Sequence, residues 1–131
     1  MDNPFESSLR KNRSRVYYLA AEELFKYQRI YFLPPDKELL SLAKKALKLD
    51  PENVAAHRFL GNIYLHMDQE QQAVQHFEIA LKLHPKDVDT LRDFGSYLFF
   101  FTEDQERGIT YLRTYLALSN WNDQDVYRMV R

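Results

Sequence analysis

The sequence has no cysteine, only three glycines and no long apolar run. Without cysteine the chain can hold neither a disulfide framework nor a thiolate metal site. Glycines this scarce and this far apart cannot form a loop that cradles a phosphate, and they disfavour a protein of sheets and loops. The longest strongly apolar run, residues 97–101, is far shorter than the roughly 20 residues of a membrane span. We therefore expect neither a membrane segment nor a cofactor.

The numbers of basic and acidic residues are also nearly equal, 18 and 19, which gives a net charge of −1. The chain thus has no global basic field for nucleic acid and no polyacidic character. Arg10, Lys11, Arg13 and Arg15 form a small basic cluster, which we interpret as a solvated helix start. Contact with an acidic partner or with phosphates is the alternative. No apolar signal segment follows Met1, and the absence of cysteine is compatible with a cytoplasmic location.

Residues that could carry catalysis or bind a metal are scattered. No two of the four histidines have the i,i+4 spacing that converges on one metal, and no His-Glu-x-x-His run occurs. No serine lies in a Gly-x-Ser-x-Gly context. We expect structural or solvated histidines, no catalytic residue and no metal site, so the chain is predicted not to be an enzyme.

What the sequence does contain is an internal repeat. The hexapeptide at residues 46–51 recurs almost unchanged at residues 80–85, displaced by 34 residues, and Gly61 and Gly95 are separated by the same distance. A fixed period of this size is typical of helical hairpins that stack into an open array. Such an array has no preformed catalytic pocket but offers a long concave face to other chains.

The central unit resembles the tetratricopeptide repeat family. That family's pattern is Trp-x2-Leu-Gly-x2-Tyr, then Ala-x3-Phe, then Pro. Only its first position departs here, with His57 in place of tryptophan, and the matching residues are Leu60, Gly61, Tyr64, Ala73, Phe77, Ala80 and Pro85. The small residues allow close helix approach, the large ones fill the layer between helices, and proline ends a helix. The resemblance implies an all-α fold, a right-handed superhelix of three tetratricopeptide (TPR) helical hairpins with a C-terminal capping helix.

The flanking units match more loosely. In the third, one extra residue in the turn around residues 102–106 places Gly108 on the small position and Leu112 on the aromatic one. In the first, the packing face of the leading helix is assigned to Tyr17, Ala20, Ala21 and Leu24. The last helix carries Val126, Tyr127 and Val130 on one side, which would cover the end of the core.

The domain layout follows from these units. Residues 1–12 are predicted to be a flexible polar lead-in and 13–131 a single TPR domain. Its repeats are 14–53, 54–87 and 88–121, and the capping helix is 122–131. Asn53 and Asp87 are expected to cap helices, and Asp123 to lie in the first turn of the last one. The helices are predicted at 13–32, 37–49, 53–67, 70–83, 87–100, 105–119 and 122–131.

The resemblance also implies a binding groove, because the first helix of each hairpin lines the concave side in this family. The predicted groove residues are Ala55, Arg58, Asn62, Leu65, Asp89, Arg92, Ser96 and Phe99, with Tyr18, Glu22 and Phe25 added from the first unit. Apolar side chains rimmed by polar ones often mark binding surfaces, and arginine and aromatic residues are enriched at interface hot spots. The alternative is that these are ordinary solvated helix faces.

These residues indicate an interaction module, either an adaptor or scaffold that binds a peptide or helix of a partner protein, or a chaperone-like module. Self-assembly into a homo-oligomer through the ends of the stack or through residues 99–101 stays open. Tetratricopeptide co-chaperones of heat-shock proteins grip a terminal carboxylate with Lys, Asn and Arg. The corresponding positions here are Tyr18, Glu22, Phe59, Asp89 and Asp93, which do not support such a clamp. We expect no nucleic acid or membrane as partner.

Overall fold

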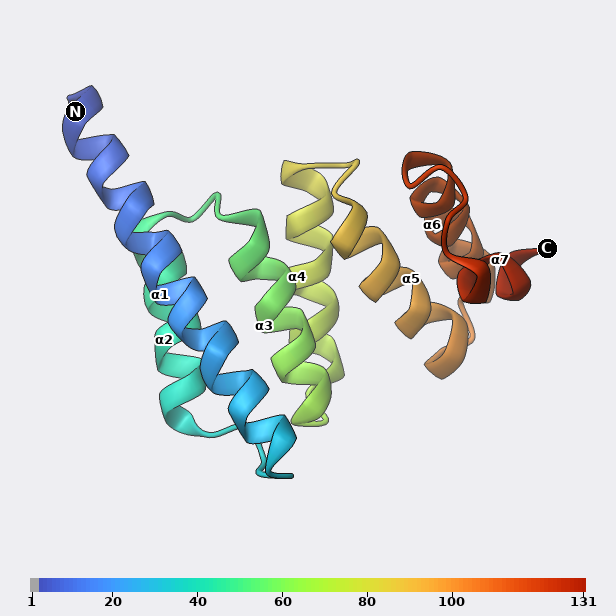
Figure 1. Ribbon diagram of the computed structural model, residues 1–131, viewed down its shortest axis with the longest axis horizontal. Coiled ribbons are helices and arrows are strands. Elements are labelled where there is room, and N and C mark those ends of the chain that lie inside the picture. Colours follow the sequence, from blue (N-terminus) through green and yellow to red (C-terminus); the bar gives the residue numbers. More distant parts are fainter. Residues whose placement is uncertain (1–2) are drawn as a thin grey trace. The chain divides into compact units, whose positions relative to one another are not determined.

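The computed structural model describes residues 3–131, which form seven helices and no strand (Figure 1). The predicted all-α repeat fold is confirmed, and none of these helices is long and apolar enough to cross a bilayer. The structure divides into two compact units, one ending at His76 and the other running from Phe77 to Arg131, and each is described by itself. The helices are α1 (Pro4–Ile30), α2 (Lys37–Leu49), α3 (Val54–His66), α4 (Glu70–Leu83), α5 (Val88–Phe101), α6 (Gln105–Leu118) and α7 (Gln124–Val130).

The first helix begins much earlier than predicted. α1 starts at Pro4, so the irregular lead-in expected for residues 1–12 is wrong for residues 4–12, whereas residues 1 and 2 lie outside the described part. The side chain of Asn3 caps the helix by accepting a hydrogen bond from the Glu6 amide at 2.8 Å. An Asn cap, a proline at the first helical position and a glutamate in the first turn are all helix-start signals.

The packing face of α1 also differs from the predicted one by a register shift. Ala21 is buried as expected, but Ala20 is exposed, and Tyr17 and Leu24 are only partly buried. The other buried residues of α1 are Ser14, Phe25 and Gln28. Because two of these residues, Ser14 and Gln28, are polar, the buried face of α1 does not appear as an apolar periodicity in the sequence.

Ser14 joins three helices of the N-terminal unit. Its hydroxyl is fully buried and donates a hydrogen bond to the Ala46 carbonyl of α2 at 2.6 Å. The same oxygen accepts a hydrogen bond from the Asn53 side-chain amide at 2.9 Å. Asn53 in turn caps α3, as predicted, by accepting from the Ala56 amide at 3.0 Å. One buried hydroxyl therefore fixes where α1 crosses α2 and where α3 begins.

The predicted core positions of the middle hairpin are buried. Leu60 and Tyr64 of α3 are 1% and 8% exposed, and Ala73 and Phe77 of α4 are fully buried. His57, which stands where the family pattern has tryptophan, is buried as well. The pattern residues therefore fill the interior, although α4 runs across the boundary between the two units.

The core of the C-terminal unit lies between α5, α6 and α7. Phe94 is fully buried, and its ring stacks on Phe77 with 5.2 Å between centroids. A second cluster of buried residues comprises Leu91, Leu112, Tyr115, Leu116, Val126 and Val130. Val126 and Val130 thus bury the face of α7 that the sequence predicts, but Tyr127 is exposed and Met129 packs against the cluster instead.

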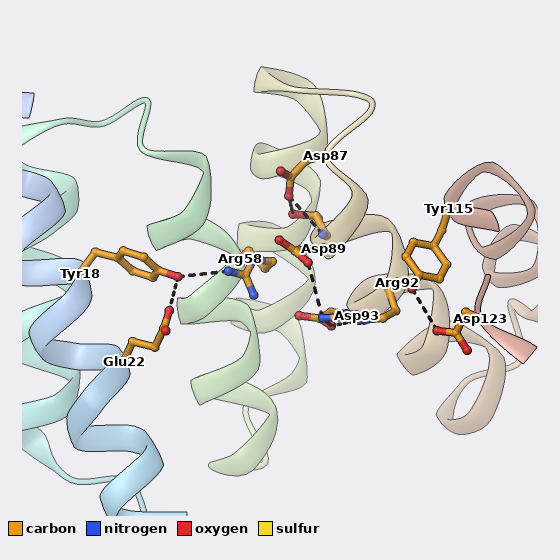
Figure 2. A network of polar contacts seen from close by, with 10 residues as sticks. Tyr18, Glu22, Arg58, Asp87, Asp89, Arg92, Asp93, Tyr115 and Asp123 are labelled. Atoms are coloured by element: carbon orange, nitrogen blue, oxygen red, sulfur yellow. Dashed lines mark hydrogen bonds and ion pairs between the residues drawn. The ribbon is translucent and has the colours of Figure 1, made fainter. Parts of the chain in front are cut away.

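Asp123 fixes the start of α7. It is the N-cap residue and not a first-turn residue as predicted, and its carboxylate accepts a hydrogen bond from the Val126 amide at 3.1 Å. Its other oxygen accepts a hydrogen bond from the Tyr115 hydroxyl at 2.9 Å (Figure 2). The amide hydrogen bond is the main reason why the pKa of Asp123 is lowered. The charged carboxylate therefore ties α7 to α6.

Two glycines set the distance between α5 and α6. A Cβ atom on Gly108 would lie 2.8 Å from both the Gly95 carbonyl oxygen and the Phe99 amide nitrogen. These are backbone atoms, which cannot rotate away. A Cβ atom on Gly95 would lie 2.9 Å from Cγ of Leu112, which belongs to a side chain. This backbone approach supports the one-residue insertion that placed Gly108 on the small position.

Replacing Gly108 with alanine should therefore destabilise the C-terminal unit. Overpacking typically costs about 1–3 kcal/mol, and the gain of up to about 1 kcal/mol from alanine's helix propensity offsets part of it. Gly95→Ala should cost less, because the Leu112 side chain can move aside. Urea unfolding followed by the fluorescence of Trp121 measures both variants. A Gly108→Ala variant as stable as Gly95→Ala would show that the backbones can separate freely.

Candidate functional site

In the N-terminal unit, the predicted groove residues Tyr18, Glu22 and Arg58 come together in one polar network. The Tyr18 hydroxyl of α1 donates a hydrogen bond to Glu22 and accepts one from Nη2 of Arg58 on α3 at 3.2 Å (Figure 2). Lys26 lies 3.4 Å from the other Glu22 oxygen. The sequence placed these residues on the same face, and the structure adds that they hold one another in position.

Burial and hydrogen bonding shift the pKa values of Tyr18 and Glu22 in this network. Burial, and then the hydrogen bond to Glu22, raises the pKa of Tyr18 to about 12. The hydrogen bond from Tyr18 is the main cause that lowers the pKa of Glu22. At neutral pH the network therefore holds a protonated phenol, a charged carboxylate and a guanidinium cation. The Arg58 side chain is oriented before any ligand arrives.

Phe25 does not belong to an exposed groove. It is only 7% exposed, and its ring packs edge-on against Phe59 at 5.4 Å and against His66 at 5.1 Å between centroids. The prediction that Phe25 adds apolar surface is therefore wrong, because the register of α1 turns it inward against α3. The other predicted residues of α3, Ala55, Asn62 and Leu65, are all partly buried.

In the C-terminal unit, the predicted groove residues Asp89 and Arg92 form an ion pair on α5. Nη2 of Arg92 lies 3.7 Å from Asp89, and its Nε lies 3.3 Å from Asp93 (Figure 2). Two carboxylates thus hold one guanidinium, and Arg92 remains partly exposed. As in the N-terminal unit, an arginine of a first helix is oriented by neighbouring side chains.

The remaining predicted residues lie further along α5. Ser96 is partly buried, and Phe99 is partly buried against the second core cluster. The rings of Phe100 and Phe101 are 60% and 75% exposed. Within the run of three aromatic residues, Phe99 therefore belongs largely to the core and the other two form the exposed surface.

Sequence reasoning missed a histidine pair in the N-terminal unit. Nδ1 of His57 lies 3.1 Å from Nδ1 of His76, and Nε2 of His57 lies 2.8 Å from the Pro51 carbonyl oxygen. A carbonyl only accepts, so His57 carries its proton on Nε2 and accepts from the Nδ1 proton of His76. The 19-residue separation hides this pair from any search for local spacing, but both residues point into the same hairpin.

The contact between His57 and His76 should make the free energy of unfolding depend on pH. Burial, and then the charge of His57, lowers the pKa of His76 from 6.5 to about 4. Since the unfolded chain binds this proton more tightly, stability is complete above pH 6.5 and falls as the pH is lowered towards 4. Partial solvent access reduces the loss to roughly 1–2 kcal/mol.

Urea unfolding between pH 4 and 7, monitored by circular dichroism, tests this dependence. His76→Gln should flatten the profile in that window, whereas His84→Gln, which removes an exposed ring 3.6 Å from the Asp87 carboxylate, should change it much less. An identical slope in the parent protein and in His76→Gln would contradict the prediction.

Among the described residues, these helix faces carry no cluster of potential metal ligands, because no group of three or more such residues converges. The polar clusters described above are hydrogen-bonded pairs and ion pairs on helix surfaces. Their arrangement fits recognition of another molecule and does not supply a nucleophile with an activating base.

The fold is that of a helical-repeat protein. Residues 40–93 match the model of the family described as tetratricopeptide repeat. The chain is also 27% identical over 114 residues to "Interferon-induced protein with tetratricopeptide repeats 2" from Cricetulus griseus, which covers 87% of this chain and 24% of the relative. Residues 40–93 are therefore similar to the tetratricopeptide repeat family, and the relative that matches most of the chain carries the same repeats in its name.

A solved structure shows the same fold. The crystal structure of PilW, described as a widely conserved type IV pilus biogenesis factor, superposes with a TM-score of 0.74 at 20% identity. The match covers 86% of this chain and 49% of PilW. The chain thus spans about a quarter of the curated relative and about half of the solved one. Repeats of this family point to a non-catalytic module that binds proteins.

Proposed function

We propose that this chain binds a segment of a partner protein through the first-helix faces of its repeats, with Arg58 and Arg92 as the principal contacts. The observation that carries the proposal is that both arginines are oriented in advance. Tyr18 holds Arg58, and Asp89 and Asp93 hold Arg92. A preoriented guanidinium loses less side-chain entropy on binding, and arginine is a frequent hot-spot residue.

The neighbouring residues suit an extended or helical peptide. Asn62, Leu65 and Ser96 add amide, apolar and hydroxyl groups that are partly exposed. An adaptor, scaffold or chaperone-like role would follow from such binding, and a cytoplasmic location is part of the same proposal.

Peptides selected from a displayed random library against the intact protein provide a ligand for the test. The double variant Arg58→Ala, Arg92→Ala should weaken the selected peptides by about 2 kcal/mol or more, the typical size of a hot-spot truncation. Arg128→Ala is the matched control, because Arg128 is exposed and, among residues 3–131, forms an ion pair only with the exposed Asp125. Thermal unfolding should change little in either variant.

Two outcomes would contradict the proposal. The selected peptides could bind the double variant as tightly as the parent, or the Arg128→Ala control could lose as much affinity. Either result would move the binding surface away from α3 and α5.

A second candidate function is self-assembly through Phe100 and Phe101, which are 60% and 75% exposed. Size measurements over a range of concentrations should then show an oligomer that Phe100→Ser with Phe101→Ser dissolves. Phe99→Ser is unsuitable for this purpose, because Phe99 packs against the core. A monomer at all concentrations would exclude this candidate.

A further inference from the structure

The N-terminal unit carries a strongly cationic surface apart from the faces discussed above. On α2, an open depression is lined by four lysines together with Leu40 and Ser41. Those lysines are Lys37, Lys44, Lys45 and Lys48, and all are exposed. Their spacing places them along one side of the helix, over about 17 Å at a rise of 1.5 Å per residue.

The surface continues onto α1. A second depression, between α1 and α2, is lined by Arg13, Val16, Tyr17, Lys45, Lys48 and Leu49. The two depressions share Lys45 and Lys48, so they form one continuous surface. We call Arg13, Lys37, Lys44, Lys45 and Lys48 the α1–α2 cationic surface. A third depression beside Lys48 adds the cations Arg10 and Lys11 but also the carboxylates of Asp50 and Glu52, so it contributes no further excess of positive charge.

The positive charge of this surface is not compensated locally. No acidic side chain lines either of the first two depressions. Within the described chain, no ion pair joins the five cations to a carboxylate. The whole protein nevertheless has a net charge of −1. Five like charges gathered on one side attract an anionic partner and repel cationic ones.

Apolar groups between the cations narrow the choice of partner. Val16 is 64% exposed, and Leu40 is partly exposed beside Lys37 and Lys44. These side chains line the two depressions between the cations, where aliphatic groups of a bound segment can contact them. Tyr17 is the aromatic residue of the lining, and Lys45 covers its ring at 5.0 Å. A nucleic-acid base would need that ring face for stacking.

We propose that the α1–α2 cationic surface binds an acidic peptide segment that carries aliphatic side chains between its carboxylates. Carboxylates would pair with the lysines while the aliphatic groups enter the depressions next to Val16 and Leu40. This surface shares no residue with the proposed first-helix site, so each of the two proposals can be tested independently of the other. The chain would then hold two partner segments, or two parts of one partner.

A fluorescent peptide in which pairs of glutamates alternate with single leucines is the probe. Its binding to the intact chain is measured by fluorescence anisotropy at low and at raised salt. Lys44→Glu with Lys48→Glu should weaken binding at least about tenfold, equivalent to about 1.4 kcal/mol. Lys82→Glu with Lys86→Glu changes the net charge equally at exposed positions outside the surface and should leave binding nearly unchanged.

A second peptide, with serine in place of each leucine, tests the apolar part and should bind more weakly. Equal effects of the two lysine pairs would overturn the proposal, since attraction would then depend on net charge alone. Equal affinity for the serine peptide would overturn it as well. So would no binding of the leucine peptide, or tighter binding of oligouridylate or of phosphatidylserine vesicles. Unchanged circular dichroism in both lysine variants ensures that a loss reflects binding.

Discussion

Replacing Phe94 with alanine should lower the free energy of unfolding of the C-terminal unit by about 3–5 kcal/mol, the usual range for a buried phenylalanine. Phe94 is fully buried and contacts three neighbours. Its ring stacks on Phe77, lies 5.5 Å from Tyr111 between centroids, and has the Arg107 guanidinium 5.1 Å above it. Truncation removes all three contacts and leaves a cavity that α5 cannot close without moving.

Urea unfolding followed by Trp121 fluorescence measures this loss, because Trp121 is the single tryptophan and lies in the same unit. Phe100→Ala is the matched control on the same helix. Its side chain is 60% exposed, so that variant should lose at most about 0.5 kcal/mol. Comparable losses in the two variants would show that Phe94 does not anchor the core.

Leu60→Ala should cost about 2–5 kcal/mol in the N-terminal unit, because it deletes most of a side chain that is only 1% exposed. Leu60 lies on the buried side of α3, about one helical turn from His57 and from Tyr64, which are also buried. The surrounding helices are held by Ser14 and Asn53, so the site cannot collapse easily around the missing atoms.

Circular dichroism is the appropriate signal for this variant, since Trp121 belongs to the other unit. Leu118→Ala makes the same chemical deletion at a position that is 40% exposed and should cost far less. A loss below roughly 0.5 kcal/mol for Leu60→Ala, with an unchanged urea slope, would mean that the register of α3 is wrong.

The sequence predicts the repeated part of the fold well because each repeat position has one physical task. Leu60, Ala73 and Phe77 must be buried in any stacked hairpin, and all three are. Gly108 could be assigned only by allowing an extra residue in the turn, and its contact with the Gly95 carbonyl justifies that choice. Helix starts were also predictable within a few residues where Asn or Asp caps them, except for α1, whose Asn3 cap was not recognised.

The prediction fails where packing uses polar residues or distant pairs. In α1 the inner face includes Ser14 and Gln28, so apolar periodicity gave a register that made Ala20 buried and Phe25 exposed. The contact between His57 and His76 depends on how two helices meet and leaves no local pattern.

The candidate site is predictable only in part, for a related reason. The family resemblance placed Arg58 and Arg92 on first helices, but nothing in that resemblance shows that Tyr18 and Asp93 orient them. The α1–α2 cationic surface was missed because its lysines come from α2, whereas Arg13 comes from α1. Only the packing of these two helices brings them together.

The length of α1 has a consequence for local unfolding. Its 27 residues extend over about 40 Å, twice the roughly 20 Å of α2. Between Pro4 and Arg13 every residue except Ser7 is exposed, and Ser14 is the first buried one. Opening the first turns therefore uncovers no core and requires little free energy. Beyond Ser14, opening must break the hydrogen bonds to Ala46 and Asn53. A protease would accordingly find cleavable chain up to that serine and a protected helix after it.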